Sequence, residues 1–412
     1  MANIIYISII SIFIISHAWE SIVDFFNAKW FDKQPDSIVS DIYDNDEYNK
    51  QQLYKKENYK FSNISGSISF VTTALILIFG LFGKLDIYIS NQVSSPLLQT
   101  LIFFAVIGIG STLLSLPFSY YHTFVIEEKF GFNKSSKLTF FTDTLKSLLL
   151  GAILGGVVLS TLVWIYNYIQ SDFWWIAWIF ISIFSVGLNF FYSTLIVPLF
   201  NKQTPLEDGE LKQAIEDFGK KAGFEIDNIY VIDGSKRSSK ANAYFAGFGK
   251  KKRIVLYDTL INQMNTGEIV AVLAHEIGHY KHKHTIANLI IGMAQTGIML
   301  YILSLFLSNT DLSLALGGTQ NKFHLGIIAF SILYSPISEF IGVFMNVISR
   351  KFEYQADNFA KSFGLENELV SGLKNLSKNS YSNLTPHPLF VFTNYSHPPI
   401  KERIKNLTTK DS

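Results

Sequence analysis

Long apolar stretches alternate with polar ones along most of the chain. Seven of the apolar stretches are long enough for a helix that crosses a bilayer, which needs about 20 residues. We expect membrane spans at residues 3–19, 65–83, 97–119, 147–169, 173–197, 285–308 and 324–349. No basic residues precede the first stretch and no clear small-residue cleavage site follows it, so we interpret it as a span and not as a signal peptide.

The polar region from residue 198 to residue 265 has the pattern of a water-soluble unit. Residues 207–222 show helical spacing of apolar positions, which predicts an amphipathic helix. Residues 228–232, 240–246 and 253–257 have the composition of short strands. A turn near residues 248–251 contains glycine and joins the last two strands. The sequence therefore predicts a small β-sheet beside a mainly helical membrane protein.

The composition supports residence in a membrane. Of the 412 residues, 49% are hydrophobic and 16% are charged, whereas a typical soluble domain has about 25% charged residues. The formal net charge is +1, and no basic stripe with interleaved aromatic residues is present, so the sequence gives no support for binding to nucleic acid. Because the chain has no cysteine, any metal ion must be held by histidine and carboxylate side chains.

The basic residues indicate how the spans are oriented. Six lysines lie in residues 20–64 and four in residues 120–146, but the alternate connections carry almost none. Basic loops stay in the cytoplasm, so seven spans place the N-terminus outside. We therefore divide the chain into five spans with cytosolic loops (1–197), a cytosolic segment (198–284), a transmembrane hairpin (285–349) and a cytosolic C-terminal segment (350–412).

The first cytosolic segment contains AVLAHEIGHYKHKH, residues 271–284, in which His275 and His279 are four residues apart and Glu276 follows the first. On an α-helix this spacing puts both imidazoles on one face. Two imidazole nitrogens with a neighbouring carboxylate suit a zinc ion and the water that it activates. The pattern is the H-E-x-x-H signature of zincins.

Such a motif can also arise by chance, in roughly one chain of this kind in a hundred, so its surroundings matter. Asn265 and Glu268 predict a helix start with a capping box, and the apolar residues 271–274 supply a helical surface around the histidines. Gly278 lowers helix propensity, which indicates close packing or approach of a ligand at that point. These features favour a zinc site.

A catalytic zinc site needs a third protein ligand, which in metzincins would be a histidine at position 285. This chain has His282 and Thr285 where that class has glycine and histidine, so the metzincin pattern is excluded. The best candidate is Glu353, with Asp357 one turn later in a predicted helix at residues 350–363. Asp357 would orient a metal-bound imidazole through its other ring nitrogen. Taken alone, both carboxylates would be an ordinary solvated helix face.

The hairpin 285–349 would cross the membrane and return, which brings the two motifs to the same cytoplasmic face. Residues Asn242, Ala243 and Tyr244 lie in a strand that could be an edge strand beside the metal and pair with an extended peptide. An ordinary hairpin is the equally weighted alternative. Glu339 lies inside a predicted span, where a carboxylate must face protein or water. We expect His282 and His284 to be surface groups near the membrane.

Six stretches together resemble the Ste24-type CAAX prenyl protease family, membrane zinc metallopeptidases of the M48 type. They are PFSYYHTFVIEEKFGFNK (117–134), PLFNKQTPLEDGELK (198–212), SKRSSKANAYFAGFGKKKRIVLYDTL (235–260), AHEIGHYK (274–281), SRKFEYQADNFA (349–360) and YSHPPIKERI (395–404). The H-E-x-x-H motif alone is shared by many zincins, but the six stretches in this order are specific.

The resemblance implies a barrel of seven transmembrane helices around a water-filled chamber, with a cytosolic zincin-like domain. It implies one zinc ion per chain held by His275, His279 and Glu353, with Glu276 as the catalytic acid and base. Asp357 then corresponds to the residue that supports a ligand histidine. The implied activity is removal of the C-terminal tripeptide from prenylated CAAX proteins or peptides.

The resemblance also assigns roles outside the zinc ligands. Asn242, followed by Ala243 and Tyr244, corresponds to the substrate-binding edge strand. His397 and Arg403 correspond to residues that help to stabilise the oxyanion and to order the site. The expected partners are the prenylated substrate and the lipid bilayer, with no nucleic acid, and the protein is expected to be a monomer.

The C-terminus ends in TTKDS and lacks the lysine-rich retrieval signal expected of an endoplasmic reticulum resident. The chain could therefore act in that membrane or in a bacterial inner membrane, with the active site facing the cytoplasm in both cases. One alternative function is a quality-control membrane protease like the HtpX group, whose members are shorter with fewer spans. Another is a channel or transporter with a regulatory metal, which would show symmetric halves or broken spans.

Overall fold

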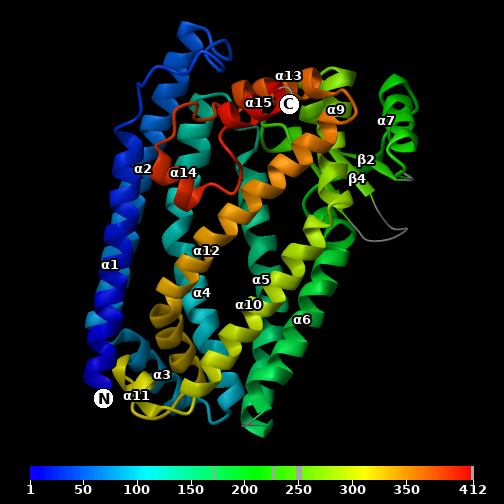
Figure 1. Cartoon of the computed structure of the whole chain (residues 1–412). Coiled ribbons are helices and arrows are strands. Elements are labelled where there is room, and N and C mark those ends of the chain that lie inside the picture. Colours follow the sequence, from blue (N-terminus) through cyan, green and yellow to red (C-terminus); the bar gives the residue numbers. More distant parts are fainter. Residues whose placement is uncertain (170–171, 225–227, 247–252, 410–412) are drawn as a thin grey trace.

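In the computed structural model, long helices stand beside one another, and a sheet and most of the shorter helices gather at one end (Figure 1). The structure describes residues 1–169, 172–224, 228–246 and 253–409. The elements that form the membrane part are α1 (Ala2–Ala28), α2 (Asn45–Ile78), α3 (Leu81–Gln92), α4 (Pro96–Tyr121), η1 (His122–Glu127), α5 (Lys137–Ile169), α6 (Phe173–Phe191), η3 (Tyr192–Ile196), η4 (Val197–Leu199), α10 (His284–Phe306), α11 (Thr310–Ala315) and α12 (Phe323–Lys361).

The remaining elements form the end that carries the C-terminus in Figure 1. They are β1 (Gln203–Pro205), α7 (Glu210–Lys221), β2 (Ile229–Ile232), η5 (Gly234–Lys236), β3 (Ala243–Ala246), β4 (Arg253–Tyr257), α8 (Asp258–Gln263), α9 (Thr266–Lys281), α13 (Glu366–Asn379), α14 (Pro388–Asn394) and α15 (Ile400–Thr408). The N-terminus lies at the opposite end of the long helices (Figure 1).

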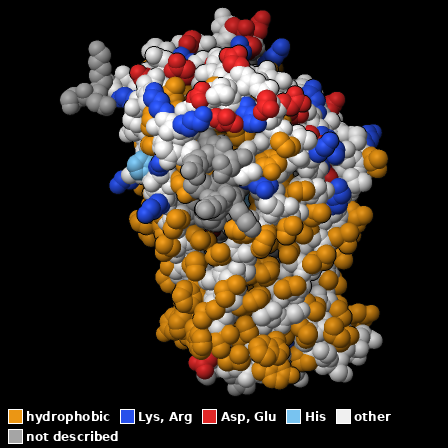
Figure 2. All heavy atoms as spheres, turned by 90° about the vertical axis from the view of Figure 1, so that its right-hand side faces the viewer, with side chains coloured by type: hydrophobic (Ala, Val, Ile, Leu, Met, Phe, Trp, Pro, Cys, Tyr) orange, Lys and Arg blue, Asp and Glu red, His pale blue; other side chains and the backbone are white. Residues whose placement is uncertain are grey.

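Seven helical stretches of the described residues are long and apolar enough to cross a membrane, which confirms the predicted number. Hydrophobic side chains cover the lower part of the face in Figure 2, and charged side chains gather above them. Large apolar side chains such as Ile7, Leu113 and Ile183 are more than 60% exposed. In a helical membrane protein such side chains can contact lipid, because the backbone polar groups are satisfied within each helix.

The second span differs from its predicted bounds at both ends. It begins at Asn45, about 20 residues early, because the Asp44 side chain accepts a hydrogen bond from the Glu47 amide in a capping box. The helix ends at Ile78, before the predicted end at Gly83. Gly80 has a φ of 57°, which turns the chain into α3. The predicted polar connection of residues 20–64 is therefore largely helical.

The last span and the predicted helix 350–363 are a single element. Helix α12 runs without a break for 39 residues, from Phe323 to Lys361. The predicted boundary between residues 349 and 350 therefore lies inside a continuous helix. At its beginning, His324 is buried and its Nε2 lies 2.9 Å from Asp86 Oδ1, while its Nδ1 lies 3.2 Å from Thr100 Oγ1. These contacts fix the end of α12 that is remote from the sheet.

The sheet has the strand order β1-β2-β4-β3. Strands β2 and β4 are parallel, and the two outer pairs are antiparallel. The strands predicted at 228–232 and 253–257 are confirmed within one residue, but β1 was not predicted because it has only three residues and ends in Pro205. The predicted strand 240–246 begins later, at Ala243. The turn predicted at residues 248–251 lies outside the described residues.

The predicted helix at residues 207–222 is confirmed as α7, with slightly shorter bounds. It packs with the sheet, α9 and α13 around one hydrophobic core, in which Ile215, Leu256 and Ile277 are fully buried. This core holds α9 in a fixed position between the sheet and the end of α12, and so it positions the two histidines of the predicted site.

Candidate metal centre and active site

Helix α9 begins where its capping residues predict. The Asn265 side chain accepts a hydrogen bond from the Glu268 amide at 3.0 Å, and the Glu268 carboxylate accepts one from the Asn265 amide at 3.1 Å. This reciprocal capping box satisfies two amides that have no partner within the helix. It fixes the helical register and therefore the direction in which His275 and His279 project.

The glycine of the motif allows α9 and α12 to approach closely. A Cβ atom at Gly278 would lie 3.0 Å from the Ala356 Cα and 3.0 Å from the Phe359 Cβ. Real Cβ contacts are almost never shorter, and the backbone of α12 could not yield without moving the whole helix. Gly278 therefore serves close packing, which is one of the two roles predicted for it. The packing brings the side chains of α12 to the histidines of α9.

His275, His279 and Glu353 meet at one point. Each offers a ligand atom, and these atoms all lie within 4.8 Å of one another. The two Nε2 atoms are 3.1 Å apart. Glu353 Oε2 lies 3.4 Å from His275 Nε2, and Glu353 Oε1 lies 3.2 Å from His279 Nε2. The side chains of His275 and Glu353 are less than 10% exposed.

This group fits a zinc ion. Two imidazole nitrogens and one carboxylate oxygen form a common donor set of catalytic zinc, which leaves a fourth position open. Glu353 Oε2 is buried and has no hydrogen-bond partner among the described residues, and the nearest donors, His275 Nε2 and Arg403 Nη1, lie 3.4 Å and 3.5 Å away. A buried carboxylate oxygen without a hydrogen bond is costly. A cation at this point would satisfy it and would separate the two facing imidazole nitrogens. His275, His279 and Glu353 are the only three-residue group of this kind found among the described residues.

Asp357 and Arg403 form the layer behind His275. Asp357 is fully buried and its Oδ1 lies 2.9 Å from His275 Nδ1, which is the nitrogen that points away from Glu353. Arg403 donates from Nε to Asp357 Oδ2 at 2.9 Å and from Nη2 to Asp357 Oδ1 at 2.6 Å. Its Nη1 lies 3.5 Å from Glu353 Oε2. One guanidinium thus spans both carboxylates that contact His275.

The charged groups around His275 and Arg403 shift the pKa values of both residues. Burial and the Arg403 charge each lower the pKa of His275, but the carboxylates of Asp357 and Glu353 outweigh them and raise this pKa to about 9. Burial also lowers the pKa of Arg403, but Asp357 and Glu353 raise it above the ordinary value. Arg403 therefore remains charged throughout the physiological range, and His275 holds a proton at neutral pH when no metal is bound.

We expect zinc binding to release a proton from His275. A metal-bound imidazole must be neutral, whereas a group with a pKa of about 9 is protonated at neutral pH. Zinc titrations of the metal-free protein in buffers of different ionisation enthalpy should show release of roughly one proton at about pH 7. The release should fall as the pH rises through the pKa. Titrations that show no proton release at neutral pH would contradict the assignment.

His284 supports His279, which corrects the prediction that it is a surface group. Its side chain is buried, and its Nδ1 lies 2.9 Å from His279 Nδ1. Its Nε2 lies 2.8 Å from Gln355 Oε1, and its ring stacks on Phe352 with centroids 4.0 Å apart. The other predicted surface group, His282, is exposed as expected.

The contacts of His284 determine its tautomer. Gln355 Oε1 can only accept, so His284 Nε2 donates to it, and His284 Nδ1 then accepts from His279 Nδ1. His279 Nε2 is left free of a proton and faces Glu353 and His275. The sequence contained one signal for this role. His284 lies only five residues after His279, at the first position of α10, the helix that directly follows α9.

We expect His284→Phe to weaken zinc binding. The substitution keeps the stacking on Phe352 but removes the acceptor for His279, and loss of such a supporting group typically costs about 10- to 100-fold in metal affinity. Competition with a chromophoric chelator would measure the change. His282→Phe is the matched control, because His282 stacks on His284 without a hydrogen bond to His279. Equal zinc affinity in both variants would exclude the role.

Two further predicted residues lie near the group. Glu276 is half-buried and forms no hydrogen bond or ion pair within the described part of the chain. His397 is 64% exposed, and its Nε2 lies 3.3 Å from Glu353 Oε1. A free carboxylate and an exposed imidazole beside a metal group are suited to proton transfer and to stabilisation of negative charge, respectively.

The predicted peptide-binding residues lie at the edge of the sheet. Strand β3 pairs with β4 alone in the described sheet, so its other edge is unpaired. Ala243 and Tyr244 belong to β3, but Asn242 directly precedes it and is exposed. The Asn242 carbonyl still accepts from the Tyr257 amide at 3.1 Å, so the ladder continues through Asn242. An edge of this kind can accept an added strand.

Two family models match the chain. The model of the CAAX prenyl protease N-terminal region, which has five membrane helices, matches residues 27–202. The model of peptidase family M48 matches residues 205–411. The border between the two matches falls after the fifth span, where the chain leaves the membrane part and enters the sheet.

Characterised relatives match almost the full length. CAAX prenyl protease 1 of Saccharomyces cerevisiae is 36% identical over 397 residues, which cover 90% of this chain and 87% of the yeast protein. The human CAAX prenyl protease 1 homolog is 34% identical, with 90% of this chain and 88% of that protein covered. The crystal structure of S. mikatae Ste24p superimposes with a TM-score of 0.94 at 34% identity, and covers 98% of this chain and 99% of that one.

Proposed function

Because the chain belongs to the M48 peptidase family and is an integral membrane zinc protease, we propose that it removes the C-terminal tripeptide from prenylated CAAX proteins. The observation that carries the proposal is the meeting of His275 and His279 with Glu353, since two segments separated by a membrane hairpin contribute to one buried donor set. The yeast relative is named CAAX prenyl protease 1, and the human relative is named its homolog.

His275, His279 and Glu353 would hold the zinc ion. When bound, zinc supplies Lewis-acid activation of the attacking water at neutral pH. Asp357 accepts a hydrogen bond from His275, and Arg403 keeps Asp357 ionised and in place. His284 accepts a hydrogen bond from His279 and so fixes the orientation of the His279 ring. With both imidazoles fixed through their Nδ1 atoms, their Nε2 atoms stay directed at a single point.

Glu276 acts as the acid and base of the reaction. Its carboxylate has no hydrogen-bond or ion-pair partner among the described residues, so it can take a proton from the attacking water and pass it to the leaving amine. His397 lies at the exposed side of the group, where it can donate a hydrogen bond to the oxyanion. Asn242, Ala243 and Tyr244 hold the substrate backbone by strand addition, which aligns the scissile bond with Glu276.

The seven spans make this a multi-pass membrane protein. We propose that the active site faces the cytoplasm, supported by the lysines of residues 20–64 and 120–146 and by the charged side chains at the same end in Figure 2. The membrane is that of the endoplasmic reticulum or a bacterial inner membrane, and the protein acts as a monomer. The lipid bilayer delivers a substrate that carries an apolar anchor.

The function is tested by comparing substrates. Detergent-purified protein should release the tripeptide from a farnesylated CAAX peptide, and a zinc chelator should abolish the release. Unprenylated casein should be degraded far more slowly. Preferential digestion of casein would instead identify a quality-control protease like the HtpX group. The full-length match to CAAX prenyl proteases does not favour that alternative or a channel.

A further inference from the structure

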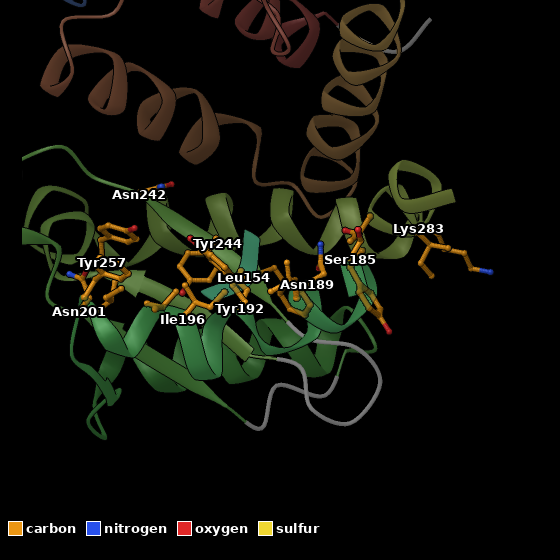
Figure 3. Close-up of a pocket in the computed structure, with 18 of the residues that line it drawn as sticks. Leu154, Ser185, Asn189, Tyr192, Ile196, Asn201, Asn242, Tyr244, Tyr257 and Lys283 are labelled. Atoms are coloured by element: carbon orange, nitrogen blue, oxygen red, sulfur yellow. The ribbon is translucent and has the colours of Figure 1, made fainter. Parts of the chain in front are cut away.

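A large cavity borders the edge strand on the membrane side of the sheet. It has a volume of about 1230 Å³ and lies between α6, η3, the sheet and the start of α10. Figure 3 shows the side chains of Tyr192, Ile196, Tyr244 and Tyr257 gathered in this space. Ligand-binding cavities typically have volumes of about 300–1,000 Å³, so this one can hold a long hydrocarbon chain together with its attached residue.

The lining of this cavity is mainly apolar and aromatic. Among the described residues that line it there is no aspartate or glutamate, and the charged ones are Lys281 and Lys283. The Tyr244 hydroxyl lies 3.4 Å from Ser193 Oγ and 3.3 Å from Gln203 Nε2, so its polar end has partners and its ring remains to line the cavity. Such a lining suits an apolar group, because little polar surface loses water when the group enters.

The cavity borders two elements that contribute to the proposed reaction site, β3 and α9. Asn242, Tyr244 and Phe245 line it, and these residues form the edge at which the substrate peptide would add as a strand. Tyr280 also lines it and directly follows His279 on α9. A group attached to the substrate beside the scissile bond could therefore enter this cavity while the peptide lies along β3.

We propose that this cavity binds the isoprenyl chain of the substrate, an inference that rests on the proposed function. The isoprenyl group is an uncharged hydrocarbon attached to the cysteine whose following peptide bond is cut. Burial of its apolar surface favours binding, and a longer chain that buries more surface binds more tightly. Occupation of the cavity would hold the cysteine beside β3 and thereby select prenylated over unprenylated chains.

A second cavity provides the internal comparison. It also has a volume of about 1230 Å³ and lies between α4 and α5. Its lining includes the charged residues Glu127, Asp143 and Arg237, but no residue of β3. An isoprenyl chain in this cavity would approach partly buried charges, and its cysteine would lie away from the edge strand. The two cavities therefore make different predictions for the same substrate.

Photocrosslinking tests the assignment without any substitution. A CAAX peptide with a diazirine-bearing farnesyl group is irradiated with the full-length protein in nanodiscs, and the labelled peptides are mapped by mass spectrometry. We expect label in residues 185–201, which line the cavity beside β3. Label concentrated in residues 101–159, or spread over many spans, would overturn the proposal.

A matched pair of substitutions gives a functional readout. Leu188→Trp fills the cavity beside β3, whereas Leu159→Trp fills the one between α4 and α5. The ratio of kcat/KM for a farnesylated peptide to that for a dimethylallylated one should fall about tenfold in Leu188→Trp and stay unchanged in Leu159→Trp. The reverse pattern, or no change in either, would overturn the proposal.

Different results would contradict the proposed function and the assignment of the cavity. If the wild-type protein releases no tripeptide from any prenylated peptide, the proposed function is wrong. If it releases the tripeptide but the label lies elsewhere, only the cavity assignment is wrong. Zinc content and thermal unfolding of both variants identify a folding defect, in which case the crosslinking result on the wild-type protein decides.

Discussion

Glu276→Gln is expected to abolish measurable turnover while zinc remains bound at one ion per chain. The amide is close in size to the carboxylate but cannot accept a proton, and positioned acid–base groups typically contribute about 10²- to 10⁴-fold to rate. Glu276 forms no hydrogen bond or ion pair within the described residues, so the substitution breaks no such interaction of the fold. The measurements are kcat on a farnesylated CAAX peptide and zinc content by atomic absorption.

The control for this substitution is Glu207→Gln, which makes the same change at an exposed position before α7. It should leave both kcat and zinc content unchanged. The assignment of Glu276 would be refuted by a variant that binds zinc fully and cleaves as fast as the wild type. Loss of zinc together with activity would show that Glu276 contributes to metal binding and not to proton transfer alone.

Glu353→Gln is expected to lose zinc as well as activity. A neutral amide oxygen is a poor replacement for a carboxylate ligand, so the loss of affinity should exceed the roughly 10- to 100-fold typical of supporting residues. The substitution also leaves Arg403 with one carboxylate where it had two, since Arg403 Nη1 lies 3.5 Å from Glu353 Oε2. Competition with a chelator and peptidase assays at saturating zinc measure the two effects.

Glu339→Gln is the matched control for Glu353, because it lies on the same helix about four turns earlier and is exposed. Its zinc affinity should equal that of the wild type. If both variants lost zinc equally, the cause would be a general disturbance of α12 and not the loss of a ligand. If Glu353→Gln kept wild-type affinity, Glu353 would not be a ligand.

Sequence reasoning reached the spans and the central motif because their signals are local. Apolar runs of about 20 residues predict spans without knowledge of packing, and the spacing of His275 and His279 on a helix is a matter of periodicity. The capping box at Asn265 and the close packing at Gly278 followed from residue type in the same way. These predictions agree with the structure.

Other features could not be predicted because they depend on contacts between distant residues. The early start of α2 at Asn45 adds a long polar helix beyond the span, and hydropathy does not detect such an extension. The sequence predicts His284 to be a surface group, because its contacts with Gln355 and Phe352 of α12 come from a distant part of the chain. The strand β1 is too short for any periodic signal, and its pairing with β2 alone defines it.

The continuity of α12 has a consequence for how the enzyme can be studied. Glu353 and Asp357 lie in the final turns of the helix that also forms the last membrane span. Helix formation is cooperative, so the stability of these turns depends on the turns before them. Deletion of the membrane-spanning part to obtain a water-soluble fragment would leave these carboxylates on a short C-terminal piece of α12. The metal ligand and the membrane span therefore belong to one helix, and an active preparation must retain the whole of α12.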